Sequence, residues 1–349
     1  MAPDARWGWR LANGTCTIRT QEFSVRTSTN SLSMNDEPFR PEDDVDKIRI
    51  LALGDSHTQA VGVEPLEAWP KVFQRDLEAT TGRHVRVYNA GTAGYSLHQY
   101  LLRLLDQGPI VKPHYVVVGL SLATDLFDLL PPDHGGWAYF EPWQRDYFDF
   151  DERGGLALRH STPAAESGSR SAASTTPSSS ASRMRQLVQH FATFRYLRHT
   201  NLALFVGSHV RIGGASLWPN MDVVVERDVA PDHQYNWRLA FALLDRINTE
   251  TAKLHARLVV LIVPYLPQVY DDVWQNTFGK DQRYSRTTSV ERLETWLQSK
   301  GIAFVDSTDA LRSAAVARGH WLHYHDDAHP TAEGQAVIAA QLLKSRVID

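Results

Sequence analysis

Short runs of apolar residues alternate with segments of helical periodicity along most of the chain. The runs are rich in Val, Ile and Leu, which is typical of strands buried on both faces of a parallel sheet. We predict strands at residues 48–53, 85–88, 115–122, 257–263 and 302–305. Apolar residues spaced three and four apart predict helices at 67–80, 97–105, 235–254, 290–300, 307–315 and 331–344.

The alternation of strands and helices predicts the fold class. Right-handed β–α–β crossovers place helices on both faces of a parallel sheet. We therefore predict an α/β fold, a three-layer α/β/α sandwich around a mostly parallel sheet of about five strands.

Two stretches depart from this pattern and set the predicted domain boundaries. Residues 1–47 are polar with scattered aromatic residues, and we expect an irregular arm with one or two short strands. Residues 131–230 are predicted to be an insertion over one rim of the sheet. Within it, 161–182 is almost wholly Ser, Ala, Thr, Pro and Gly, which buries too little apolar surface to fold, so we predict disorder there. The main domain then comprises 48–130 and 231–349.

Composition narrows the class of protein. A chain of 349 residues with 43% hydrophobic and 22% charged residues is typical of a soluble globular protein. The net charge of −4 gives no sign of a nucleic-acid partner. The single Cys16 excludes an internal disulfide framework and a cysteine-based zinc site. No apolar run is long enough for a membrane span, and the sequence as given shows no signal peptide. Compartment and oligomeric state stay open.

The first candidate for chemistry follows the first predicted strand. Gly54 ends that strand, and Asp55 and Ser56 come directly after it. In open parallel sheets, ligands bind just beyond the carboxyl ends of the strands, so Ser56 stands where a nucleophile would be. Asp and Ser are also common helix caps, and this stretch alone favours the cap.

The second candidate is the loop before the last helix, His323-Tyr-His-Asp-Asp-Ala-His-Pro330. A histidine three residues after an aspartate, as in Asp326 and His329, can donate its Nδ1–H to the carboxylate. Its other nitrogen is then free to take a proton from a hydroxyl group, which is the arrangement of serine hydrolysis. Histidine suits this role because its pKa lies near neutrality.

Three motifs in this order resemble the SGNH (GDSL-type) hydrolase family, in particular its bacterial carbohydrate O-acetyl esterases and related acyl-handling proteins. The motifs are Gly54-Asp55-Ser56, Asn89…Gly94 and Asp326-x-x-His329-Pro330. The resemblance covers roughly residues 48–130 and 235–345. It implies an SGNH/flavodoxin-like version of the three-layer fold and a serine esterase or deacetylase.

The resemblance also implies roles for single residues. Ser56 would be the nucleophile, and its backbone N–H would donate to the oxyanion together with that of Gly94. His329 would be the general base and Asp326 its orienting partner, with Asp327 as the less favoured alternative. The substrate would be a small-molecule or saccharide ester, most simply an O-acetylated saccharide, and no cofactor or metal would be needed.

The chain departs from the family at two positions. The family has an Asn donor after the third strand, where this chain has Thr124. Either Thr124 donates in its place, another group does, or activity is low, since losing one donor costs about 3 kcal/mol of transition-state stabilisation. His57 stands where the family often has an apolar residue; we favour packing over a substrate contact. The candidate substrate-binding residues are Asp55, His57 and Asn89.

Other interpretations of these residues stay open. His323, His325, Asp326, Asp327 and His329 contain the ligand types of a metal cluster, although the chain has no His-Glu-x-x-His pattern. Aromatic residues of the insertion either stack on a sugar or form a small core, which we favour; they are Trp137, Tyr139, Phe140 and Trp143. An O-acyltransferase would use the same triad, and a non-catalytic binding module would be consistent with Thr124. Proteins that resemble this one are often exported, which also leaves the compartment open.

Overall fold

The computed structural model describes residues 1–127, 129–130, 145–160, 211–212, 215–216 and 221–348. The predicted disorder at 161–182 and the aromatic cluster at 137–143 lie outside the described residues.

The central sheet has five strands, all parallel, in the order β13-β12-β7-β5-β6. They are β5 (Ile48–Gly54), β6 (Val85–Asn89), β7 (Tyr115–Ser121), β12 (Arg257–Val263) and β13 (Ala303–Asp306). Ile50, Val117 and Val260 have no exposed surface, which explains why these strands are continuous apolar runs. The sheet lies inside the molecule, and the predicted α/β class is confirmed.

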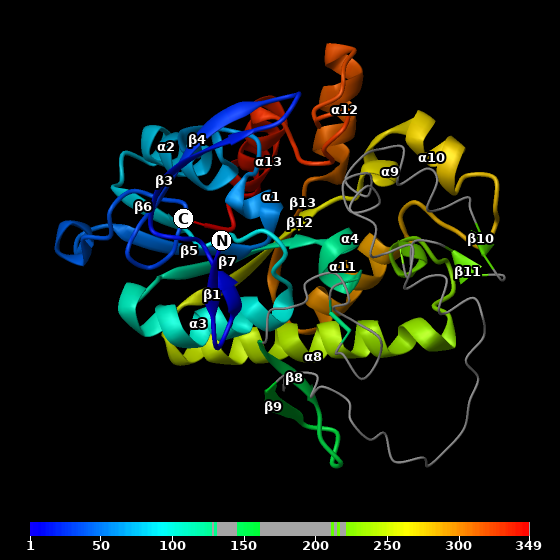
Figure 1. Cartoon of the computed structure of the whole chain (residues 1–349), viewed down its shortest axis with the longest axis horizontal. Helices are drawn as coiled ribbons and strands as arrows, with labels where there is room; N and C mark the ends of the chain where they lie inside the picture. The colour runs from blue at the N-terminus through cyan, green and yellow to red at the C-terminus, as the bar shows by residue number, and fades with distance from the viewer. Residues whose placement is uncertain (128, 131–144, 161–210, 213–214, 217–220, 349) are drawn as a thin grey trace, which may run out of the picture.

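Helices cover both faces of the sheet (Figure 1). On one face lie α2 (Trp69–Thr81), α12 (Thr308–Arg318) and α13 (Ala332–Ser345). On the other lie α3 (Leu97–Val111) and α8 (Pro231–Lys253), and α11 (Thr288–Ser299) packs beside α8 through Trp296, which stacks on Phe241 at 4.8 Å. The predicted three-layer sandwich is therefore confirmed.

The boundaries of the elements differ from the prediction in a few places. The predicted helix at 97–105 extends to Val111, and Lys112 then ends it with a φ of 48°, just before Pro113. Pro113 disfavours a helical residue before it, so the helix ends at this position. The periodicity did not predict the short helices, because they have too few turns to show a repeat. These are α1 (Ser56–Gln59), α4 (Leu122–Phe127), α9 (Leu266–Val269), α10 (Asp271–Thr277) and the 3₁₀ turns at Pro41–Asp44, Pro65–Glu67 and Met221–Val224.

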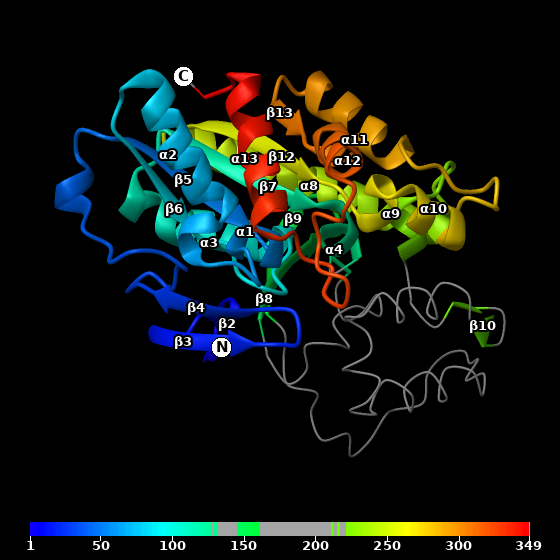
Figure 2. The same cartoon turned by 90° about the horizontal axis from the view of Figure 1, so that it is seen from above.

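The N-terminal arm is more regular than predicted. It forms two antiparallel hairpins, β1 (Ala2–Asp4) with β2 (Gly8–Arg10) and β3 (Gly14–Arg19) with β4 (Ser24–Thr29). They lie along one side of the domain (Figure 2). The indole N–H of Trp9 donates to the Ala93 carbonyl at 3.0 Å, and the buried Asp36 pairs with Lys71 at 2.6 Å. The arm is thus fastened to the main domain.

The described part of the predicted insertion contains two antiparallel strand pairs, of which the first packs on the main domain. It forms the hairpin β8 (Asp146–Phe150) with β9 (Leu156–His160), and the short pair β10 (Arg211–Ile212) with β11 (Ala215–Ser216). Phe148 is buried, and its N–H donates to Nδ1 of His98 on α3 at 3.2 Å. The boundaries at 131 and 230 stay a prediction.

Candidate active site

Ser56 lies at the first position of α1, where β5 and its neighbour β7 end. Gly54 is opposite Gly119 in the parallel register. A Cβ on Gly54 would lie 2.0 Å from Thr58 Oγ1, and one on Gly119 would lie 2.3 Å from it. Two glycines therefore let α1 start directly on the strand ends. They place Ser56 at the carboxyl ends of the parallel strands, which is the usual ligand position in such folds.

Asp55 is a buried carboxylate that organises the start of α1. It accepts the backbone N–H of His57 at 2.8 Å and the hydroxyl of Thr124 at 2.6 Å, and it contacts Nδ1 of His57 at 3.1 Å. Burial raises the pKa of Asp55, but the contacts with His57 and Thr124 lower it by more, so the net pKa lies below the ordinary value. The side chain is 1% exposed, so Asp55 supports the start of α1, while the predicted substrate contact through Asp55 stays a prediction.

Thr124 does not take the place of the missing Asn. Its hydroxyl carries one proton, and that proton is donated to Asp55. The short side chain reaches only the neighbouring carboxylate, so the prediction of Thr124 as an oxyanion donor is wrong in this structure.

Asn89 is also a structural residue. It has no exposed surface, its backbone N–H donates to Asp36 at 3.0 Å, and its side-chain oxygen accepts the N–H of Gly91 at 3.1 Å. The side chain thus shapes the loop that leads to Gly94, and the predicted substrate contact through Asn89 stays a prediction.

The loop from Asn89 to Gly94 is held against α1. The Ala93 N–H donates to the side chain of Gln59 at 2.8 Å. Gly94 has a φ of 79°, a conformation that favours glycine. Among the described residues, neither the Ser56 N–H nor the Gly94 N–H donates a hydrogen bond. Both predicted backbone donors are therefore available to a ligand, while their role in an oxyanion hole stays a proposal.

The partner of His329 is Asp327, not Asp326. The Asp327 carboxylate contacts Nδ1 of His329 and also accepts the His329 backbone N–H at 3.2 Å. The side chain of Asp326 is exposed, and its backbone N–H donates to Glu22. The prediction that Asp326 contacts His329 is therefore wrong, and the alternative that the sequence left open, Asp327, makes this contact.

Glu22, from the turn between β3 and β4, explains this difference. Its carboxylate accepts the consecutive backbone N–H groups of His325, Asp326 and Asp327 at 2.6, 2.9 and 3.0 Å. These bonds curl the loop and fix the carboxylate that faces the histidine. Sequence reasoning missed Glu22, because the contact spans about three hundred residues and leaves no local pattern.

His323 is a second support of the loop. It is 2% exposed, and Nδ1 lies 2.7 Å from the Tyr270 hydroxyl, which in turn accepts the Leu322 N–H. Burial, followed by the nearby His57 and His329, lowers the pKa of His323 to about 3. His323 is therefore neutral and holds the loop against α9 and α10.

His57, at the start of α1, and His329, in the loop before α13, lie side by side. Their rings lie 5.2 Å apart between centroids, and the Gln335 side chain of α13 donates to the His57 carbonyl at 3.2 Å. No hydrogen bond joins Ser56 Oγ to His329, both of which the structure describes. Catalytic hydrogen bonds are often long before substrate binds. The arrangement therefore brings a serine, an imidazole and a carboxylate to one place.

The pH dependence of activity should follow His329. Burial lowers its pKa, but Asp327 and then Asp55 raise it by more, so the net pKa lies above the ordinary value near 6.5. A general base must be unprotonated, so kcat/KM should be high above this pKa and fall as the pH decreases through it. We expect the acid limb above pH 6.5 and a shift to lower pH in Asp327→Asn, measured as a pH profile of ester hydrolysis. A limb near pH 4 would contradict His329 as the base.

Gly91 should be essential to the support of this site. An added Cβ would lie 2.1 Å from the Gln59 backbone nitrogen, so Gly91→Ala should destabilise the fold by about 1–3 kcal/mol. Urea unfolding measures this. Gly155→Ala is the matched control, because its Cβ would meet Asp151 only at 3.5 Å. Equal stability of the two variants would contradict the close packing of this loop on α1.

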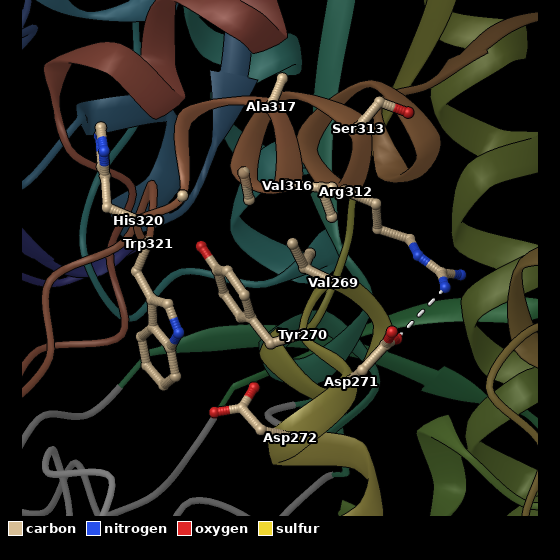
Figure 3. A pocket seen from close by; sticks show the side chains of 12 residues that line it. Val269, Tyr270, Asp271, Asp272, Arg312, Ser313, Val316, Ala317, His320 and Trp321 are labelled. Carbon is tan, nitrogen blue, oxygen red and sulfur yellow. Dashed lines mark hydrogen bonds and ion pairs between the residues drawn. The ribbon is translucent and has the colours of Figure 1, made fainter.

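A separate hollow of about 730 Å³ lies beyond the histidine loop (Figure 3). It is lined by residues of α9, α10 and α12 and of the segments beside them, among them Tyr270, Asp271, Arg312 and Trp321, and neither Ser56 nor His329 lines it. Trp321 stacks on Tyr270 at 4.5 Å and on His325 at 4.8 Å. The hollow thus shares Tyr270 with the support of His323.

Two features are absent from the described residues. These residues contain no group of three or more His, Cys, Asp or Glu side chains placed to hold a metal ion. Within the same residues, no helix combines the length and apolar character needed to cross a membrane.

Comparison with known proteins gives structural matches only. No family model and no curated protein sequence matches the chain. Among solved structures, it is similar to a protein described as lipolytic and of the G-D-S-L family from Desulfitobacterium hafniense, with 10% identity and a TM-score of 0.42 over 85% of this chain and 99% of the other.

Two further matches have similar values. A catalytic mutant of Axe2, an acetylxylan esterase from Geobacillus stearothermophilus, matches with 13% identity and a TM-score of 0.44 over 86% of this chain and 94% of the other. LAE5, an alpha/beta hydrolase enzyme from the metagenome of Lake Arreo, matches with 15% identity and a TM-score of 0.44 over 85% of this chain and 94% of the other. These identities and TM-scores are too low to assign a function to this chain.

Proposed function

We propose that the protein is a serine esterase in which Ser56 is the nucleophile, His329 the general base and Asp327 its orienting carboxylate. The observation that carries this proposal is the Asp327–His329 pair beside the start of α1. The ring of His329 lies 5.2 Å from the ring of His57, the residue that follows Ser56. A carboxylate on Nδ1 fixes the tautomer that leaves Nε2 free to accept a proton.

The first half of the proposed reaction forms an acyl-enzyme. Ser56 Oγ attacks the ester carbonyl carbon while its proton passes to Nε2 of His329. The negative oxygen of the tetrahedral intermediate accepts hydrogen bonds from the backbone N–H groups of Ser56 and Gly94. His329 then gives the proton to the leaving alcohol as the carbon–oxygen bond breaks. In the second half, a water molecule releases the acyl group and restores Ser56.

The proposed substrate is an O-acyl ester of a small molecule or saccharide, most simply an O-acetylated saccharide, and this choice rests on the motif resemblance. The test is incubation with 4-nitrophenyl acetate and with acetylated xylo-oligosaccharides, followed by mass spectrometry of the products. Release of acetate that depends on Ser56 supports the esterase. No acetate from either ester would support the binding module instead.

An O-acyltransferase is the second candidate, since it uses the same acyl-enzyme. The same incubation with an added sugar acceptor separates the two. An acetylated acceptor in place of free acetate would identify the transferase.

A further inference from the structure

The site contains two aspartate–histidine pairs of the same local design. In each pair the aspartate precedes the histidine by two residues, accepts its backbone N–H and contacts its Nδ1. For Asp55 and His57 these distances are 2.8 Å and 3.1 Å; for Asp327 and His329 the backbone bond is 3.2 Å. The tilted rings face one another at 5.2 Å. The proposed esterase mechanism uses only the second pair.

The Asp55 carboxylate makes more contacts than a helix cap requires. A cap needs one carboxylate oxygen for a backbone N–H, which His57 supplies. Here the second oxygen, Oδ2, is contacted both by the imidazole and by the Thr124 hydroxyl, at 3.1 and 2.6 Å. An apolar side chain would fill the space of His57 without these bonds. The contacts therefore orient the ring as well as cap the helix.

This orientation decides which nitrogen of His57 is available. The Asp55 carboxylate is buried and ionised, so Nδ1 carries the proton and Nε2 has a free lone pair when the ring is neutral. The His57 side chain is 12% exposed and that of His329 is 19% exposed, so both rings reach the surface of the site. His57 thus presents the same proton-accepting group as His329, directly next to Ser56.

We infer that His57 is a second general base, which acts on the incoming hydroxyl, of water or of an alcohol acceptor, when the acyl-enzyme breaks down. This rests on the proposed serine-esterase function. Once Ser56 Oγ is acylated, only the incoming hydroxyl has a proton to give. Its oxygen bonds to the acyl carbon as its proton passes to His57 Nε2. The carbon–Oγ bond then breaks, Oγ takes that proton, and free Ser56 and neutral His57 are restored.

The test separates the two half-reactions in the full-length protein. With 4-nitrophenyl acetate, His57→Gln should release the first equivalent of nitrophenol as fast as wild type, and then turn over at least about 100-fold more slowly. Acetyl-enzyme on Ser56 should accumulate in intact-mass spectra. Because acylation is unaffected, kcat and KM should fall together and kcat/KM should stay unchanged.

Two variants serve as controls. Thr124→Val removes one bond to Asp55 and should slow only the turnover phase, by less than His57→Gln. His320→Gln, at an exposed histidine paired with Glu333, should behave as wild type. Unchanged turnover in His57→Gln, or an equal loss in the burst and in turnover, would overturn the inference while leaving the esterase intact. A wild type that forms no adduct at Ser56 would refute the esterase and this inference with it.

Discussion

Ser56→Ala should abolish ester hydrolysis and labelling by a fluorophosphonate probe. The probe reacts only with a serine whose proton is removed by a nearby base, so it reports nucleophile activation without knowledge of the substrate. Loss of the serine nucleophile of a triad lowers kcat by about 10⁶-fold. The fold should be unchanged, because in the described part of the chain the Ser56 hydroxyl makes no hydrogen bond that Ala would lose. Intact-mass spectrometry after labelling measures the result.

The matched control for this experiment is Ser313→Ala, at an exposed serine of α12 that lines the separate hollow. Wild type and Ser313→Ala should each gain one probe molecule, and Ser56→Ala none. A probe adduct that persists in Ser56→Ala would place the reactive serine elsewhere. A folded wild type that stays unlabelled would contradict activation of Ser56 and support the binding module.

The parts of the site that the sequence predicted are those encoded locally. The apolar run before Gly54 predicts a buried strand, and the position of Ser56 follows from the topology of parallel sheets. The same holds for the loop that carries His329, because Pro330 and the following periodicity predict the helix after it. The fold class, the succession of strands and helices along the chain, and the positions of the segments that carry Ser56 and His329 therefore follow from short-range patterns.

The parts that the sequence missed depend on contacts between distant segments. Asp326 and Asp327 are neighbours, and the three backbone bonds to Glu22 decide how the loop carrying them is held. The sequence makes Thr124 a candidate oxyanion donor, but in the structure its hydroxyl donates to the buried Asp55. In both cases the residue type permits the predicted role, and a partner from another element directs the side chain elsewhere.

The N-terminal arm illustrates the same point. Its composition predicts an irregular segment, yet Glu22 holds the histidine loop and Phe23 packs on Tyr324 of that loop at 5.0 Å between ring centroids. Tyr324 also donates to the Gly62 carbonyl at 2.7 Å, which joins the loop to the segment after α1. The arm therefore belongs to the support of the site, although no residue of it carries a motif.

Asp327→Asn and Asp326→Asn should differ strongly, although the two residues are adjacent and the substitutions identical. Asp327 contacts Nδ1 of His329, whereas the Asp326 side chain is exposed. An amide at position 327 can present its N–H₂ to Nδ1 and so favour the tautomer with the proton on Nε2, which cannot accept the proton of Ser56. The corresponding change in a serine protease lowers kcat about 10⁴-fold, and we expect a loss of this order for Asp327→Asn.

Asp326→Asn should retain the activity of wild type, because the loop is held at position 326 through the backbone N–H, which the substitution keeps. Steady-state kinetics with 4-nitrophenyl acetate, together with thermal unfolding of both variants, measures the difference. Two folded variants with the reverse order of activity would return the orienting role to Asp326 and show that the loop rearranges when substrate binds. Equal and small losses would mean that His329 needs no carboxylate partner, and the triad would reduce to Ser56 and His329.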